Sequence, residues 1–129
     1  MTAACTAVSD CVLTGGGIVV RTERKATAAD AAGVEVTDTQ IHSTFDDGIV
    51  CEGPNTRCNL ESNRIQGSDG YGIWVRFGAC PTIRNNDVVS GHGDGVGVWH
   101  GRSAPIIVSN RITKNEGNGI TITKVIVYH

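Results

Sequence analysis

The chain has 129 residues, enough for one domain of ordinary size with a single hydrophobic core. Its net charge of −2 and its 19% of charged residues argue against nucleic acid as a partner. No apolar run approaches the roughly 20 residues that span a bilayer, and the first ten residues lack the basic and apolar regions of a signal peptide. The five cysteines show no zinc-finger spacing and are expected to be reduced thiols. We therefore expect an intracellular, specifically cytoplasmic, protein with no membrane or nucleic-acid partner.

The first elements of the chain are irregular. Short apolar runs at Val12 and from Ile18 to Val20 predict two strands within residues 10–33. Residues 21–33, "RTERKATAADAAG", form a basic and alanine-rich insertion that we expect to be a loop or a short helix covering one side. Regular repeats then run from residue 34 to residue 123, within a single domain that spans residues 1–129.

Three apolar registers recur along the regular part of the chain. One register follows an Asn or its equivalent by two residues, at intervals of 23 to 29 residues: Val12, Ile41, Ile65, Val88 and Ile112. A second register follows a glycine: Ile18, Ile49, Ile73, Val98 and Ile120. A third register precedes the Asn by three residues: Val36, Leu60, Ile83 and Ile107. Each unit thus predicts three short strands and three turns, and such small units bury an apolar face only when they are stacked.

Stacking makes specific predictions about columns of equivalent residues. The apolar registers are expected to point inward, and Cys51 to be a small core residue aligned with Val20 and Val75. Asn63, Asn86 and Asn110 are expected to take the left-handed conformation and to hydrogen-bond from coil to coil. The glycine before each inward Ile or Val is likewise expected to take the left-handed conformation, at another corner of the coil. The longer interval from Val88 to Val98 predicts a bulge at "SGHGDG", residues 90–95.

The repeated pattern resembles that of a known family. "PTIRNNDVV", residues 81–89, followed by a Gly-x-Gly-Val step resembles the right-handed parallel β-helix repeat of pectin-lyase-like proteins. It is most similar to the CASH-type repeats of NosD-type proteins and of F-box β-helix substrate receptors. The resemblance implies an all-β fold: a short single-stranded right-handed parallel β-helix, or solenoid, of about five coils with three short strands per coil. Because family members carry more coils, we expect either a piece of a longer β-helix or a subunit that buries its ends.

Two tryptophans are candidates for a binding surface. Trp74 and Trp99 each follow an inward position, so both are expected to point outward. We call equivalent positions within the repeat a slot, and the two tryptophans are expected to share one slot in adjacent coils. Arg76 falls on the same face, with Glu52 and Arg102 near it. Neighbouring exposed tryptophans indicate a bound protein side chain or sugar ring. The alternative is a surface ladder that only stabilises the sheet.

Acidic residues gather at one predicted corner. Asp69, Asp94 and Glu116 each lie four residues before an inward position, and Asp46 and Asp47 occupy the matching turn one coil earlier. Such a column would hold Ca²⁺ or supply an acid and a base, whereas the simpler interpretation is ordinary Asp-Gly turn chemistry. We expect no cofactor, with Ca²⁺ as the alternative.

Some of these residues resemble parts of polygalacturonase-type motifs. In that comparison Asp46 and Asp47 would be acid and base, and His92 an auxiliary residue. The resemblance fails on spacing, because Asp47 and His92 are 45 residues apart, which is two coils here.

The leading functional hypothesis is a non-enzymatic binding or scaffold module that presents a rigid face to a protein partner. The alternatives are a polygalacturonase-like or pectate-lyase-like carbohydrate-active enzyme and a carbohydrate-binding module. End-to-end self-association through the terminal coils is a further predicted interaction, because terminal coils expose unpaired strand edges.

Overall fold

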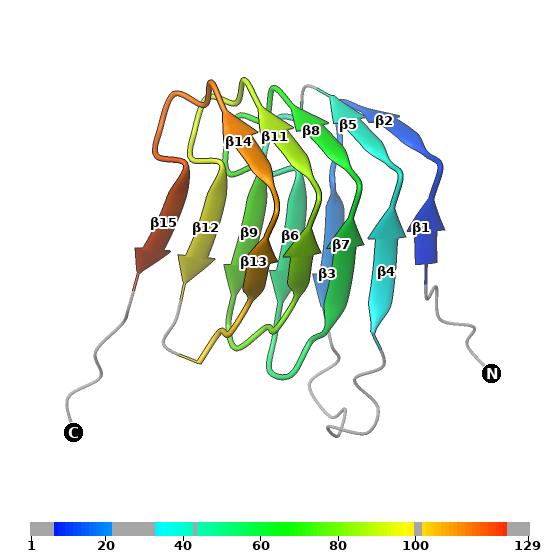
Figure 1. The fold of residues 1–129 in the computed structure, drawn as a ribbon, viewed down its shortest axis with the longest axis vertical. Coiled ribbons are helices and arrows are strands. Elements are labelled where there is room, and N and C mark those ends of the chain that lie inside the picture. Colours follow the sequence, from blue (N-terminus) through cyan, green and yellow to red (C-terminus); the bar gives the residue numbers. More distant parts are fainter. Residues whose placement is uncertain (1–6, 22–32, 43, 100–101, 124–129) are drawn as a thin grey trace.

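The computed structural model describes residues 7–21, 33–42, 44–99 and 102–123. These residues form fifteen strands and no helix (Figure 1). The strands are β1 Ala7–Ser9, β2 Val12–Thr14, β3 Ile18–Arg21, β4 Val34–Thr37, β5 Gln40–His42, β6 Ile49–Glu52, β7 Cys58–Glu61, β8 Arg64–Gln66, β9 Ile73–Arg76, β10 Thr82–Arg84, β11 Asp87–Val89, β12 Val96–Trp99, β13 Ile106–Val108, β14 Arg111–Thr113 and β15 Ile120–Thr123. Most of the predicted insertion lies outside the described residues.

The strands assemble into three parallel sheets of five strands each. Sheet A has the order β1-β4-β7-β10-β13, sheet B β2-β5-β8-β11-β14 and sheet C β3-β6-β9-β12-β15. Each successive set of three strands gives one strand to every sheet, so that one coil lies upon the next (Figure 1). The predicted stack of about five coils with three short strands each is confirmed.

The core consists of aliphatic columns inside the coils. Sheet C supplies two of these columns, and register pairing places Ile18, Ile49, Ile73, Val96 and Ile120 in one and Val20, Cys51, Val75, Val98 and Ile122 in the other. The predicted position of Cys51 is confirmed, and its side chain is buried. The middle coils bury these residues almost completely, because each has a coil on both sides.

Two predicted members of the core columns are wrong. Val96, and not Val98, stands opposite Ile73, so eight residues separate it from Val88 and the predicted bulge is absent. In the first coil Leu13 pairs with Ile41 and packs against the core, whereas Val12 pairs with Gln40 and is 66% exposed. Both errors arise where two apolar residues lie close together in the sequence.

Buried asparagines connect the corners between sheets A and B. Asn86 Oδ1 accepts hydrogen bonds from the backbone N and Nδ2 of Asn63, both at 3.0 Å, and Asn86 Nδ2 donates to the carbonyl of Leu60 at 2.7 Å. In the same way, Asn110 Oδ1 accepts hydrogen bonds from the backbone N and Nδ2 of Asn86, and Asn110 Nδ2 donates to the carbonyl of Ile83. The predicted coil-to-coil ladder is confirmed.

The left-handed residue of this corner is not the one predicted. It is the residue before each ladder asparagine that has positive φ: Ser62 at 59°, Asn85 at 55° and Ser109 at 56°. The ladder asparagine lies inside the coil, and the turn residue before it points outward. Polar turn residues tolerate the left-handed region at little cost, so this corner needs no glycine.

The glycines at the corner before sheet C have a different role from the one predicted. Gly48, Gly72, Gly95 and Gly119 do not have positive φ. A Cβ atom on Gly72 would lie 2.7 Å from the carbonyl oxygen of Gly95, and one on Gly95 would lie 2.6 Å from that of Gly119. These glycines are therefore required for close backbone approach between coils.

Two cysteines differ from the prediction of reduced thiols. Cys51 in β6 and Cys58 in β7 form a disulfide across the turn that leads from sheet C to sheet A, and both are buried. The bridge spans the corner at residues 53–57, and Cys11 and Cys80 are free. The sequence did not reveal this pairing, because strand spacing alone does not show which side chains meet across a corner.

Candidate functional site

Three aromatic side chains meet on the outer face of sheet C. We call Tyr71, Trp74 and Trp99 the aromatic cluster. The Tyr71 and Trp74 ring centroids lie 5.1 Å apart, and the Trp74 and Trp99 rings meet edge to face with centroids 5.8 Å apart. Trp99 Nε1 donates a hydrogen bond of 3.1 Å to Tyr71 Oη. The cluster thus joins two adjacent coils through ring contacts and one polar contact.

The two tryptophans do not occupy the same slot, contrary to the prediction. Trp74 stands opposite Gly97, whereas Trp99 stands opposite Thr123. A Cβ atom on Gly97 would overlap the Tyr71 ring, so the glycine makes room for the tyrosine. Sequence reasoning missed Tyr71, although a glycine at an outward strand position next to Trp74 is the signal that a side chain covers the strand there.

Arg76 and Glu52 lie beside the aromatic cluster, on the face where the sequence analysis expected them. Arg76 Nε lies 2.8 Å from Glu52 Oε2, and the guanidinium carbon is 4.0 Å from the Trp74 ring centroid and 5.1 Å from that of Phe77. Arg102 is exposed and makes no ion pair with any described residue. Arg76 is therefore held by a carboxylate on one side and by an aromatic face on the other.

The aromatic cluster keeps free surface and one unused donor. Trp99 is 38% exposed and the neighbouring Phe77 is 47% exposed. Trp74 Nε1 is buried and has no hydrogen-bond partner among the residues that the structure describes. A buried N–H without an acceptor costs free energy, so the cluster is not fully satisfied by its own residues.

The predicted column of Asp69, Asp94 and Glu116 does not exist. With Val96 as the inward residue, His92 takes the slot between Asp69 and Glu116, and its Nδ1 lies 2.8 Å from Asp69 Oδ1. Asp94 belongs instead to the slot of Asp47, two coils away. The acidic side chains are consequently distributed over two slots and do not converge.

Asp47 and Asp94 brace the turn of the following coil. Asp47 Oδ1 accepts from the backbone N of Tyr71 at 2.7 Å, and Asp94 Oδ1 accepts from that of Asn118 at 2.7 Å. Asp94 Oδ2 also accepts from Thr121 Oγ1 at 2.8 Å. Asp46 is exposed beside Asp47. Among the described residues, no three His, Cys, Asp or Glu side chains come together as a metal site.

Burial raises the pKa of Asp47 above its ordinary value of 3.8. The hydrogen bond from Tyr71 and the charge of Arg76 oppose this shift, while the neighbouring carboxylate of Asp46 adds to it. Because the folded chain holds this proton more tightly than the unfolded chain, the Asp47 contribution to stability falls as pH rises from 3.8 through the folded pKa.

Asp47→Asn is expected to remove this part of the pH dependence. The amide keeps an acceptor for the Tyr71 N–H and cannot ionise. The stability of the variant relative to the wild type therefore increases as the pH is raised from 3 to 7. The gain stays below about 1 kcal/mol, because the carboxyl is partly exposed and water screens it. Urea midpoints at several pH values check this, with the exposed Glu35→Gln as control. A difference that is constant with pH would contradict the expectation.

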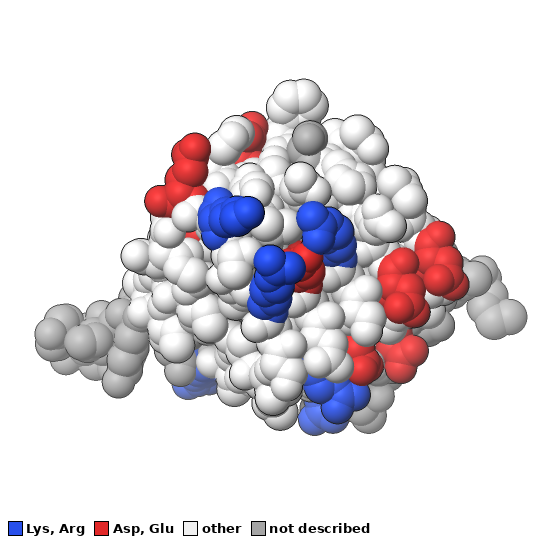
Figure 2. Space-filling view, turned by 45° about the horizontal axis from the view of Figure 1, so that its top comes forward, with Lys and Arg blue, Asp and Glu red and all other residues white. Residues whose placement is uncertain are grey.

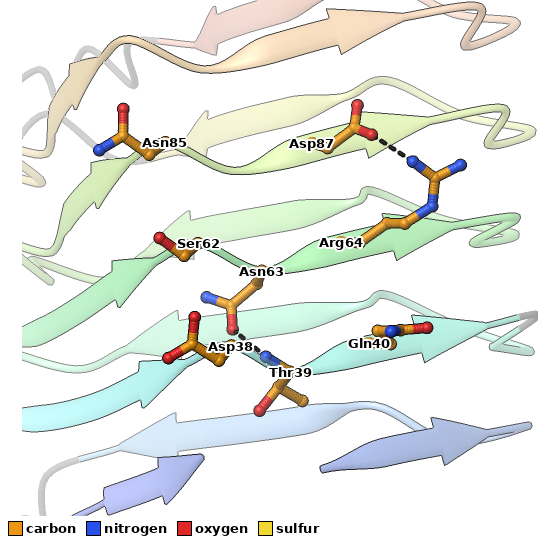
Figure 3. Close-up of a pocket in the computed structure, with 8 residues that line it drawn as sticks. All are labelled: Asp38, Thr39, Gln40, Ser62, Asn63, Arg64, Asn85 and Asp87. Carbon is orange, nitrogen blue, oxygen red and sulfur yellow. Dashed lines mark hydrogen bonds and ion pairs between the residues drawn. The ribbon is translucent and has the colours of Figure 1, made fainter. Parts of the chain in front are cut away.

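A shallow polar depression lies at the corner between sheets A and B, and sequence reasoning missed it. We call it the corner hollow; it has a volume of roughly 420 Å³ and is lined by Asp38, Thr39, Gln40, Ser62, Asn63, Arg64, Asn85 and Asp87 (Figure 3). In Figure 2 basic side chains lie near the middle of the visible face and along its lower edge, and acidic ones lie mostly toward its sides. The turn residues that line the hollow follow from the repeat, but their common side was not inferred.

The comparisons with known proteins concern the fold. A family model described as a right handed beta helix region matches residues 16–127. No curated protein and no solved structure matches the chain. Within the described residues, no helix is long and apolar enough to cross a membrane. The fold alone does not determine the function, which depends on the residues on the surface of the solenoid.

Proposed function

The chain belongs to the family of right-handed β-helix regions, and we propose that it is a non-enzymatic binding module that docks a protein partner. The observation that carries the proposal is the aromatic cluster on sheet C, which is partly exposed and retains an unused indole N–H. Aromatic side chains on a rigid support dominate the energetics of protein interfaces. The solenoid supplies that rigid support, because each strand is paired with its equivalents in the neighbouring coils.

The arrangement of the rings favours a protein side chain over a sugar ring. The Trp74 and Trp99 planes are inclined at 81°, so together they offer a stepped surface and no flat platform. Arg76 already covers the Trp74 ring. In this proposal an apolar side chain of the partner packs against the exposed part of Trp99. We therefore assign the partner as a protein segment with an apolar anchor residue.

A polysaccharide hydrolase or lyase is the second candidate. The raised pKa of Asp47 favours it, because a general acid needs such a shift. Against it, Asp47 and Asp94 each hold a backbone N–H of the next coil, and the neighbouring carboxyl of Asp46 is exposed. These contacts support bracing carboxylates more strongly than an acid and base pair.

Trp99→Ala is expected to weaken binding of the partner by at least about thirtyfold, the effect of an interface hot spot. The partner is captured with the wild-type chain from extracts of the source organism, purified, and titrated by calorimetry. Trp99 is the better test residue, because Trp74 lies deeper in the cluster and also supports the sheet. Val19→Ala is the matched control, since Val19 is 56% exposed on the same sheet and lies two coils from Trp74.

Two other results would contradict the proposal. If the wild-type chain cleaves polygalacturonate and Asp47→Asn abolishes the cleavage, the chain is an enzyme. If it binds oligosaccharides without turnover and Trp99→Ala abolishes that binding, the cluster is a carbohydrate site. Circular dichroism of each variant establishes that the fold is kept.

A further inference from the structure

One wall of the corner hollow consists of unused polar side chains. Asp38, Ser62 and Asn85 occupy equivalent left-handed turn positions, with φ of 50°, 59° and 55°, and follow one another along three coils (Figure 3). All three are exposed. Within the described part of the chain, the side chains of these three residues make no hydrogen bond. The row therefore presents a carboxylate, a hydroxyl and a carboxamide at the spacing of the coils, about 4.8 Å.

The other wall carries side chains that are already partly paired. Arg64 is paired with Asp87, and its second terminal nitrogen lies 3.5 Å from Gln66 Oε1. Gln40 Oε1 is 3.3 Å from His42 Nε2. The remaining carboxylate oxygen of Asp87 is buried and has no hydrogen-bond partner in the described part of the chain. The lining carries one more negative charge than positive charge, with Asp38 and Asp87 against Arg64, and the exposed carboxylate of Asp38 has no side-chain partner among the described residues.

We propose that the corner hollow binds the guanidinium group of an arginine side chain from a protein or peptide. A guanidinium offers five N–H donors in a planar fork. Asp38 accepts two of them side by side, and Ser62 Oγ and Asn85 Oδ1 accept others along the row. The positive charge balances the excess negative charge of the lining, whereas an anion would face the unpaired Asp38. A neutral hydroxylated ligand would leave that charge uncompensated.

This site is separate from the aromatic cluster. The corner hollow lies between sheets A and B, and the aromatic cluster lies on the outer face of sheet C. Loss of binding at one site is not expected to change binding at the other. The guanidinium proposal can therefore fail while the proposed function holds, and the reverse is also true.

The test is a titration of the ¹⁵N-labelled chain with the peptide acetyl-Gly-Arg-Gly-amide, followed by amide chemical shifts. We expect saturable shifts at residues 38–40, 62–64 and 85–87, and none at the aromatic cluster. The same peptide with citrulline in place of arginine keeps the shape and removes the charge, and it should bind on the order of tenfold more weakly. Spermidine tests whether the ligand is a free polyamine instead of an arginine side chain. It is expected to bind more weakly than the arginine peptide.

Asp38→Asn supplies the decisive variant, because asparagine also tolerates the left-handed conformation and the fold is kept. The substitution should weaken binding of the arginine peptide by about tenfold or more. Asp10→Asn is the matched control, since Asp10 has φ of 53° at the same turn of the first coil but does not line the hollow. Equal binding of the citrulline peptide, equal binding by Asp38→Asn, tighter binding of spermidine, or shifts confined to another surface would each overturn the proposal.

Discussion

Asn86→Ala is expected to lower the free energy of unfolding by roughly 2–4 kcal/mol. The substitution removes the acceptor for the backbone N and Nδ2 of Asn63 and the donor for the carbonyl of Leu60. These partners are buried in the middle of the stack, where water cannot replace the lost side chain. The measurement is urea denaturation followed by tryptophan fluorescence and circular dichroism.

Asn59→Ala is the control for this substitution. Asn59 lies on the outer face of β7, and its side chain makes no hydrogen bond with any described residue. We expect a change within about 0.5 kcal/mol, typical of a surface position. If Asn86→Ala and Asn59→Ala had equal midpoints, the ladder would contribute nothing beyond the aliphatic columns.

Gly72→Ala is the second substitution with a large expected effect. Its Cβ atom would lie 2.7 Å from the carbonyl oxygen of Gly95 and would overlap Val88 Cγ1. The backbones of two coils would have to separate, which costs roughly 1–3 kcal/mol and more where the backbone cannot shift. Thermal denaturation of the purified variant measures the loss, and the amount of soluble protein shows whether it folds at all.

Gly119→Ala is a matched control from the same column of glycines. In the last described coil no further described coil lies against it, and its Cβ atom would meet only Ile112 Cγ2, at 3.9 Å. An ordinary contact of that length predicts stability close to the wild type or slightly above it, because alanine restricts the unfolded chain. A large loss in Gly119→Ala would mean that the column requires glycine for its backbone conformation, as first expected.

Sequence reasoning succeeded where the repeat leaves one choice of position, although it wrongly expected the ladder asparagines to take the left-handed conformation. The asparagines at positions 63, 86 and 110 and the β-branched residues around them predicted the stack, the three strands per coil and the hydrogen-bonded ladder. It failed where two equivalent choices lie two residues apart. Gly95-Val96 and Gly97-Val98 both satisfy the glycine–apolar pattern, and both valines are buried, so alternation alone does not select between them.

The surface features were harder to predict for a related reason. The slots of Trp74 and Trp99 depend on the register of β12, so the error of two residues also misplaced the tryptophans and Asp94. The contact of Tyr71 with Gly97 requires two coils in their actual alignment. The corner hollow depends on which turn residue takes positive φ, and this is the residue before each ladder asparagine rather than the asparagine that the sequence analysis selected.

The asparagine ladder has a direction, and this direction bears on synthesis. The backbone N–H of Asn63 is satisfied by a side chain 23 residues later in the chain, and that of Asn86 by one 24 residues later. A nascent corner emerging from the ribosome thus stays incomplete until the following rung has been translated. The hydrogen bonds of each rung are therefore completed one repeat after its own synthesis, and the last rung made always carries a backbone N–H that still lacks its acceptor.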